Sequence, residues 1–85
     1  YMDRAEILDV LKKLLEEKYE IQADTLTPET RQDDIGLDSM TMVDLMLDIE
    51  TELNFEFPDL RVPPNPSLNE IVDLVSSALA EQRGT

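Results

Sequence analysis

The most informative stretch of this sequence is residues 38–53, which read DSMTMVDLMLDIETEL. Plotted at about 100° per residue, as in an α-helix, its apolar residues fall into two stripes on opposite sides. The stripe that is typical of a core face comprises Met42, Leu45, Met46, Ile49 and Leu53. The opposite stripe comprises Met40, Val43 and Leu47, and the acids beside it are Asp44, Asp48 and Glu50. This periodicity predicts a helix over residues 39–53.

The second apolar stripe has two possible explanations. The helix could be central and buried on all sides, or the stripe could be exposed as a docking surface. In a domain of 85 residues, two flanking helices can hardly cover both sides of a third. We therefore expect an exposed apolar strip with an acidic rim, which suits a partner that presents basic groups.

Ser39 stands at the start of this predicted helix, directly after Asp38. Either residue could be the N-cap, because Asp and Ser side chains both accept hydrogen bonds from first-turn amides. If Asp38 is the cap, Ser39 becomes the first helical residue and its hydroxyl stays free. A phosphate ester there would lie beside the positive end of the helix dipole, which stabilises exposed anions by roughly 0.3–1 kcal/mol. Ser39 is therefore a candidate phosphate carrier.

Capping signals predict two further helices. Asp3 and Glu6 have capping-box spacing ahead of residues 4–19, and Ser67 and Glu70 repeat that spacing ahead of a C-terminal helix. Both segments repeat apolar residues at intervals of three and four, which gives each helix one apolar face. The residues on the two faces are Ile7, Leu8, Leu11, Leu14, Leu15 and Tyr19, and then Leu68, Ile71, Val72, Val75, Ala78 and Leu79.

The segments between the predicted helices are long. Residues 21–37 have no helical periodicity, and their anchoring apolar residues are Ile21, Leu26, Ile35 and Leu37. Residues 59–66 contain three prolines, which exclude a regular helix there. No segment alternates convincingly like a strand. We therefore expect one all-α domain over residues 1–85, a small bundle of three main helices with a short or irregular third helix before the last.

The composition restricts the kinds of partner. The net charge is −13, from 20 acids and 7 bases, and the stretch from Gln32 to Leu60 contains nine acids and no base. Phosphates would be repelled, so we expect no nucleic acid and no membrane surface as partner, but proteins with basic patches. The absence of Cys and His excludes disulfides and a His base. No apolar run is long enough to resemble a membrane span, and the N-terminal segment does not resemble a signal peptide. We therefore expect a cytoplasmic protein.

The stretch Asp34–Met40 reads DIGLDSM and resembles the D-x-G-x-D-S-[LM] signature of acyl carrier proteins, and the likeness continues to Asp59. This resemblance implies a four-helix bundle with a short third helix, in which 4′-phosphopantetheine is joined to Ser39 through a phosphodiester. It implies a partner-binding surface that comprises Asp38, Met40, Val43, Asp44, Leu47 and Glu50. The positions that match the family's interior are Leu45, Ile49, Leu53 and Phe57. Residues 60–66 depart from the family pattern.

The resemblance implies a stand-alone carrier without catalytic activity of its own. The carrier would hold an acyl or aminoacyl group as a thioester on the arm, as in fatty acid or polyketide biosynthesis. The implied partners are a phosphopantetheinyl transferase that supplies magnesium, a ligase or transferase that loads the cargo, and downstream synthases with basic docking patches. We expect the carrier itself to be a monomer.

Two other functions remain open at this point. The chain could be an acidic protein–protein interaction module without a prosthetic group, in which Ser39 has only a structural role. Asp33, Asp34 and Asp38 could bind calcium, but their spacing does not match the D-x-D-x-D-G loop, so we expect no metal site. A hydrolase built on Ser39 is excluded, because no His or nearby Lys could activate its hydroxyl.

Overall fold

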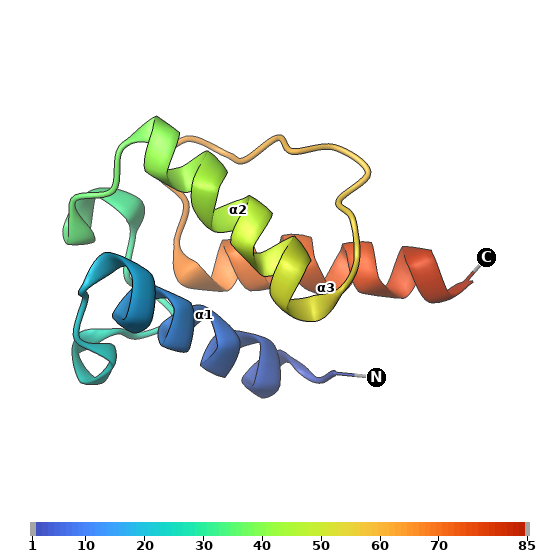
Figure 1. Ribbon diagram of the computed structural model, residues 1–85, viewed down its shortest axis with the longest axis horizontal. Coiled ribbons are helices and arrows are strands. Elements are labelled where there is room, and N and C mark those ends of the chain that lie inside the picture. Colours follow the sequence, from blue (N-terminus) through green and yellow to red (C-terminus); the bar gives the residue numbers. More distant parts are fainter. Residues whose placement is uncertain (1, 85) are drawn as a thin grey trace.

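The computed structural model describes residues 2–84 of the chain, and side chains for residues 2–82. Its elements in chain order are α1 (Arg4–Tyr19), the 3₁₀ turns η1 (Ala23–Thr25) and η2 (Gln32–Ile35), α2 (Ser39–Leu53) and α3 (Leu68–Gly84). Figure 1 shows the three α-helices as the body of the molecule, joined by two long connections. The described part of the chain contains no helix with the length and apolar character needed to cross a membrane.

The helix boundaries follow from the capping residues. Asp3 Oδ1 accepts from Glu6 N at 2.9 Å and Glu6 Oε1 accepts from Asp3 N at 3.0 Å, so the capping box of α1 is complete. Ser67 and Glu70 form the same reciprocal pair at α3, at 3.1 and 2.9 Å. Helix α2 ends at Leu53, and its C-cap Asn54 has a φ of 56°, in the left-handed region that Asn tolerates better than most residues. Both predicted capping boxes are thus confirmed.

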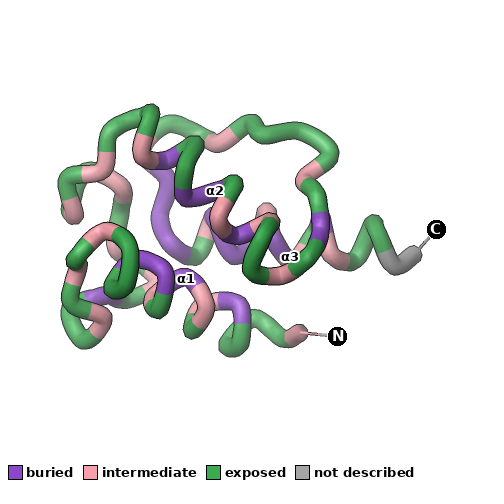
Figure 2. Tube along the Cα trace, viewed as in Figure 1, coloured by how far each residue is buried: buried purple, intermediate pink, exposed green. Residues whose placement is uncertain are grey.

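The core lies between the three helices, and α1 packs against both α2 and α3. Figure 2 shows the buried positions on the facing sides of the helices. The buried apolar residues are Ile7, Leu11, Leu14, Leu15, Leu26, Met42, Leu45, Met46, Ile49, Phe55, Leu68, Ile71, Val72, Val75 and Ala78. Of the four residues that match the family's interior, Leu45 and Ile49 are fully buried, whereas Leu53 and Phe57 are half-buried at its edge.

The connection from α2 to α3 contains no helix in the described structure, so the expected irregular segment is confirmed. It leaves α2 through a turn in which Phe57 N donates to Glu50 Oε2 at 2.7 Å. In the same turn the rings of Phe55 and Phe57 pack edge to face, with 4.8 Å between their centroids. The chain then runs back beside α2 toward the start of that helix (Figure 1). Prolines at 63, 64 and 66 explain the irregular path, because proline lacks the N–H that a helix needs.

The connection from α1 to α2 is fastened to the start of α3. Gln32 N donates to Pro66 O at 3.0 Å, and Leu68 N donates to Thr30 O at 2.9 Å. Leu26 is buried, while the other predicted anchors, Ile21, Ile35 and Leu37, are half-buried against the core. These contacts fasten the connection before α2 to the start of α3.

The excess of acids predicts a stability that depends on salt. Among the described side chains, five ion pairs engage only five of the 20 acids. Repulsion among the remaining carboxylates opposes folding, and dissolved ions screen it over about 8 Å at physiological ionic strength. We expect the melting temperature, followed by circular dichroism, to rise as sodium chloride is added. A melting temperature that does not change with ionic strength would contradict this prediction.

Candidate functional site

Ser39 is the first residue of α2, and Asp38 is its N-cap. Asp38 has extended backbone angles (φ −87°, ψ 178°), and its Oδ1 accepts a hydrogen bond from Thr41 N at 2.8 Å. Ser39 is exposed, and among the described residues its hydroxyl has no hydrogen-bond partner. Of the two capping arrangements that the sequence allowed, the structure has the one that leaves this hydroxyl free.

The charge around Ser39 is set by the end of the helix and by Asp38. The hydrogen bond from the Thr41 amide lowers the pKa of Asp38 below its ordinary value, so this carboxylate is ionised at neutral pH. The N-terminal amides of α2 give this end of the helix a partial positive charge. An anion esterified to the Ser39 hydroxyl would therefore lie beside the positive end of α2 and next to a carboxylate that is ionised at neutral pH.

The turn before α2 is braced by Gln32. Its Nε2 donates to Leu37 O at 2.7 Å, and Leu37 N donates back to Gln32 O at 3.1 Å. Gly36 closes this turn with a φ of 69°, in the left-handed region where a side chain would cause strain, although a Cβ there would meet no atom within 4 Å. The glycine is thus required by backbone conformation rather than by lack of space.

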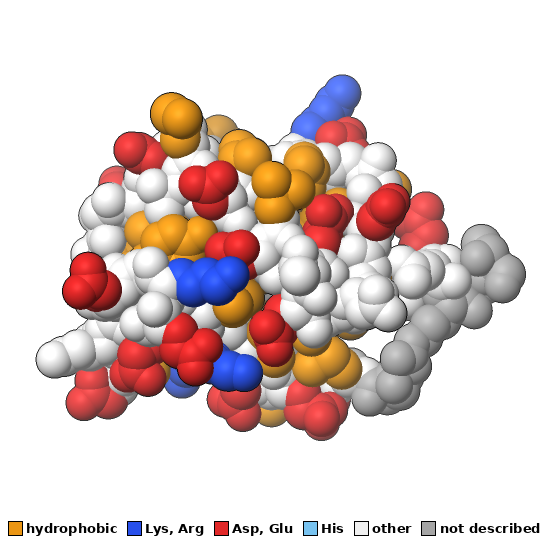
Figure 3. Space-filling model, in the orientation of Figure 1, with side chains coloured by type: hydrophobic (Ala, Val, Ile, Leu, Met, Phe, Trp, Pro, Cys, Tyr) orange, Lys and Arg blue, Asp and Glu red, His pale blue; other side chains and the backbone are white. Residues whose placement is uncertain are grey.

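The outer apolar stripe of α2 is exposed, as expected. Met40, Val43 and Leu47 are 80%, 48% and 44% exposed, whereas the core stripe on the opposite side is buried apart from Leu53. In Figure 3 apolar side chains gather over α2, with acidic side chains around them. The explanation that buries α2 on all sides is therefore wrong. We call the residues Met40, Val43 and Leu47 the outer strip.

The acids beside the outer strip differ in their roles. Asp44 is exposed, as expected for a residue of the rim. Asp48 instead turns toward α1, where it accepts from Tyr19 Oη at 2.9 Å and from Lys18 Nζ at 3.1 Å. Burial, together with the Asp48 carboxylate, raises the pKa of Tyr19 to about 12. Glu50 is half-buried and is bonded to the Phe57 amide. Of the three acids expected beside the outer strip, only Asp44 is exposed, and Asp38 at the start of α2 is exposed as well.

A groove of about 400 Å³ opens beside Ser39, between the start of α2 and the proline-containing connection. Its lining residues are Gln32, Ser39, Met42, Val43, Leu60, Val62, Pro63, Pro64 and Asn65. Leu60 is 41% exposed and extends the apolar surface beyond the outer strip. Sequence reasoning missed Leu60 and Val62, although two apolar residues in an otherwise polar and proline-rich segment were a usable signal.

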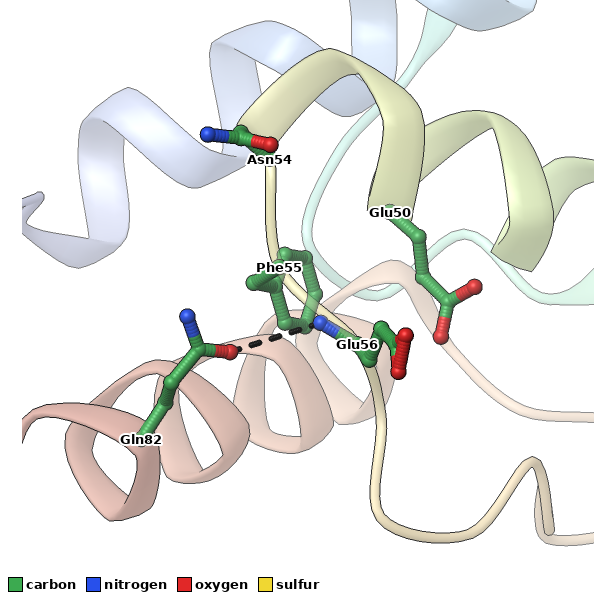
Figure 4. A pocket seen from close by; sticks show the side chains of 5 residues that line it. All are labelled: Glu50, Asn54, Phe55, Glu56 and Gln82. Atoms are coloured by element: carbon green, nitrogen blue, oxygen red, sulfur yellow. Dashed lines mark hydrogen bonds between the residues drawn. The ribbon is translucent and has the colours of Figure 1, made fainter. Parts of the chain in front are cut away.

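A second hollow, of about 370 Å³, lies at the opposite end of α2 (Figure 4). Its lining residues are Glu50, Asn54, Phe55, Glu56 and Gln82. Glu56 N donates to Gln82 Oε1 at 3.4 Å, which links the end of α2 to α3. Because this hollow is formed at the C-terminal end of α2, it is separate from the surroundings of Ser39.

Two of the three acids considered for calcium, Asp34 and Asp38, have other partners. Asp34 Oδ2 accepts from Arg31 N at 2.8 Å, and Asp38 Oδ1 is used by the cap of α2. Among the described side chains, no group of three or more potential ligands is arranged to hold a metal ion.

Known proteins with similar sequences identify the family of this site. Residues 9–75 match the family model described as a phosphopantetheine attachment site, which defines the class: a small helical domain that carries phosphopantetheine. The acyl carrier protein of Coprothermobacter proteolyticus is 32% identical over 79 residues, which are 92% of this chain and 96% of that protein. The chain belongs to the acyl carrier protein family.

Two other relatives have related names. The acyl carrier protein of Clostridium perfringens is 31% identical over 71 residues, covering 82% of this chain and 93% of that protein. Acyl carrier protein 2, mitochondrial, of Arabidopsis thaliana is 28% identical over 78 residues, covering 91% of this chain and 62% of that protein. Members of this family are carriers that work with transferases and synthases, and their cofactor is 4′-phosphopantetheine. This membership does not agree with a module that lacks a prosthetic group.

The residues at the start of α2 fit this cofactor. Attachment requires a hydroxyl that an enzyme can reach, and the Ser39 hydroxyl is exposed and has no hydrogen-bond partner among the described residues. A phosphodiester requires a site that tolerates negative charge, which the N-terminal end of α2 supplies. The groove beside Ser39 also leaves space for a flexible chain next to the attachment point.

The capping role of Asp38 leads to a pH-dependent prediction. We expect Asp38→Ala to lower the melting temperature at neutral pH, because the Thr41 amide loses its acceptor. Asp38→Asn is the matched control, since Asn caps helices about as well but carries no charge. The wild type should be more stable than the Asn variant at neutral pH, because the ionised carboxylate interacts with the helix end.

The sign of the pH dependence follows from the lowered pKa of Asp38 in the folded state. The stabilisation is present at pH values above the ordinary aspartate pKa, and it is lost as the pH falls through the lowered value of the folded protein. Melting curves recorded from neutral to acidic pH should therefore show the difference between wild type and Asp38→Asn shrinking. A difference that stays constant on acidification would mean that the charge of Asp38 contributes nothing.

Proposed function

We propose that this chain carries an acyl or aminoacyl group as a thioester on 4′-phosphopantetheine joined to Ser39, and presents that group to biosynthetic enzymes. The observation that carries the proposal is the Ser39 hydroxyl, which is exposed, has no partner among the described residues, and lies at the N-terminal end of α2. When attached, the arm would supply a terminal thiol, which explains how a chain without Cys can take part in thioester chemistry. The partner residues proposed are Asp38, Met40, Val43, Asp44, Leu47 and Glu50.

In the proposed loading step, Ser39 Oγ forms a bond to a phosphorus atom of coenzyme A. The bond between that phosphorus and the nucleotide part of coenzyme A breaks, and the hydroxyl proton passes to a base. We propose that the phosphopantetheinyl transferase supplies the magnesium and the base; the sequence of the carrier contains no histidine. We propose that the carrier performs no catalysis itself.

The outer strip is proposed as the docking surface for the transferase, for a loading ligase or acyltransferase, and for downstream synthases. Its apolar side chains would supply the contact area, and Met40 could adapt to different partners. Asp38 and Asp44 would guide partners with basic patches toward Ser39. Glu50 would contribute less, because its carboxylate already accepts a hydrogen bond from the Phe57 amide.

We also predict that the chain is a monomer, that it forms one domain over residues 1–85, and that it is located in the cytoplasm.

The carrier role can be tested with an acylated donor. Purified apo-protein is incubated with acetyl coenzyme A, magnesium and a phosphopantetheinyl transferase of broad specificity, and its intact mass is measured. We expect the mass of one acetylated arm to be added. Neutral hydroxylamine should then remove the acetyl group but not the arm, because it cleaves thioesters and leaves phosphodiesters. A protein whose mass does not change would contradict the proposed function.

A further inference from the structure

The groove beside Ser39 has a size and a lining that suit a ligand. Its volume of about 400 Å³ falls in the range of roughly 300–1,000 Å³ that is common for small-molecule sites. Ser39 itself is one of the lining residues, so a chain attached to its hydroxyl begins inside the groove. One wall is α2, through Met42 and Val43, and the opposite wall is the connection from Leu60 to Asn65.

The second wall is stiff and is held in place from outside the groove. Asn65 has a φ of 46°; its Oδ1 accepts from Asp33 N at 3.0 Å and its carbonyl accepts from Arg31 Nη1 at 2.9 Å. Pro63 and Pro64 restrict the backbone just before it. These bonds fasten the wall to the turn that precedes α2. The groove therefore exists before any ligand enters, which lowers the entropic cost of binding.

The lining combines apolar groups with two primary amides. Gln32 uses its Nε2 to hold Leu37, and Asn65 uses its Oδ1 to hold Asp33. Gln32 Oε1 and Asn65 Nδ2 have no partner among the described residues. The residues that line the groove thus include two amides that each keep one atom without a partner, together with the apolar side chains of Val43, Leu60 and Val62. A flexible ligand with methyl groups and amide bonds would match both features.

We propose that the pantetheine part of the arm folds back from Ser39 into this groove, with its paired methyl groups against Val43 and Val62 and an amide near Gln32 and Asn65. This inference rests on the proposed function, because it requires an arm on Ser39. Pantetheine has a branched apolar unit close to the phosphate and two amide bonds along its chain, and the lining contains both apolar side chains and amides. The proline-containing connection thereby serves as a wall for the arm.

Nuclear magnetic resonance can test this inference on the full chain. Protein labelled with ¹³C and ¹⁵N is converted to the holo form with unlabelled coenzyme A, and intermolecular nuclear Overhauser effects are recorded between the arm and the protein. We expect contacts from the pantetheine methyl protons to the methyl groups of Val43 and Val62, and a shift of the Asn65 side-chain amide relative to apo-protein. Perturbations confined to residues 38–41 would overturn the inference.

Two variants sharpen the test. Val62→Asp places a charge in the groove and should abolish the contacts, while intact mass confirms that the arm is still attached. Arg61→Asp introduces the same side chain one position earlier, at an exposed residue outside both the lining and the proposed docking surface, and should leave the contacts unchanged. Contacts that appear only when an acyl chain is loaded would also overturn the inference, and would assign the groove to the cargo. If no arm is attached to wild type, the proposed function fails; if the arm is attached without contacts, only this inference fails.

Discussion

Replacing Ser39 by alanine is expected to abolish attachment of the arm completely. In the proposed attachment the Ser39 oxygen forms the phosphoester, and alanine has no side-chain oxygen. The fold should be unaffected, because the hydroxyl makes no hydrogen bond to the described residues. Intact mass after incubation with coenzyme A, magnesium and a phosphopantetheinyl transferase should show one added arm on wild type and none on Ser39→Ala.

Thr41→Val is a suitable control for this experiment. Thr41 is the nearest other hydroxyl residue in the first turn of α2, and it is half-buried. Valine has almost the same shape as threonine, so this variant should still gain one arm. Matching circular dichroism spectra of the three proteins would exclude unfolding as the reason for a loss. If Ser39→Ala gains as much mass as wild type, Ser39 is not the attachment residue.

The second large effect is expected from truncating the core stripe of α2. Leu45 is fully buried, so Leu45→Ala should leave a cavity and lower the free energy of unfolding by about 2–5 kcal/mol. Leu47 is only two positions away but is 44% exposed, so Leu47→Ala should have a much smaller effect. Both changes in the free energy of unfolding can be measured by urea unfolding. The comparison requires that the slope of this free energy against urea concentration is the same for the wild type and both variants. A similar large loss for Leu47→Ala would mean that the outer strip is buried.

The same pair of variants separates folding from docking. Leu47→Ala should weaken engagement of partner enzymes, because it removes apolar area from the centre of the proposed docking surface. The transferase is a convenient partner, since the concentration of carrier that gives half-maximal loading can be measured directly. We expect this concentration to rise for Leu47→Ala. If the concentration for half-maximal loading does not change, the outer strip has no role in docking the transferase.

The boundaries of the helices could be predicted because they depend on nearby residues. The Asp3 and Ser67 caps act on amides three positions away, and the two stripes of α2 follow from helical periodicity alone. The exposure of Met40 could be predicted because helical periodicity places it opposite the core stripe, and the domain has too few helices to cover that side. The prolines near residue 64 made the irregular connection predictable, because their effect on the backbone is local.

The features that escaped prediction depend on contacts between distant segments. Asp48 appeared to belong to the acidic rim, but the packing of α1 on α2 brings it to Lys18 and Tyr19, some thirty positions earlier. Glu50 is likewise bonded to Phe57 because the chain turns back after α2. The groove beside Ser39 depends on the return of residues 60–65 to the start of α2, and no periodicity in the sequence encodes that return.

The most direct test of the proposed attachment is to locate the arm on the wild-type protein. After loading, the protein is digested, and fragment-ion mass spectrometry is used to find the residue that carries the added mass. We expect the modification on Ser39 alone, because its hydroxyl is exposed and lies at the N-terminal end of α2. An arm found instead on Thr41, Ser67, Ser76 or Ser77, or no arm at all, would contradict the assignment.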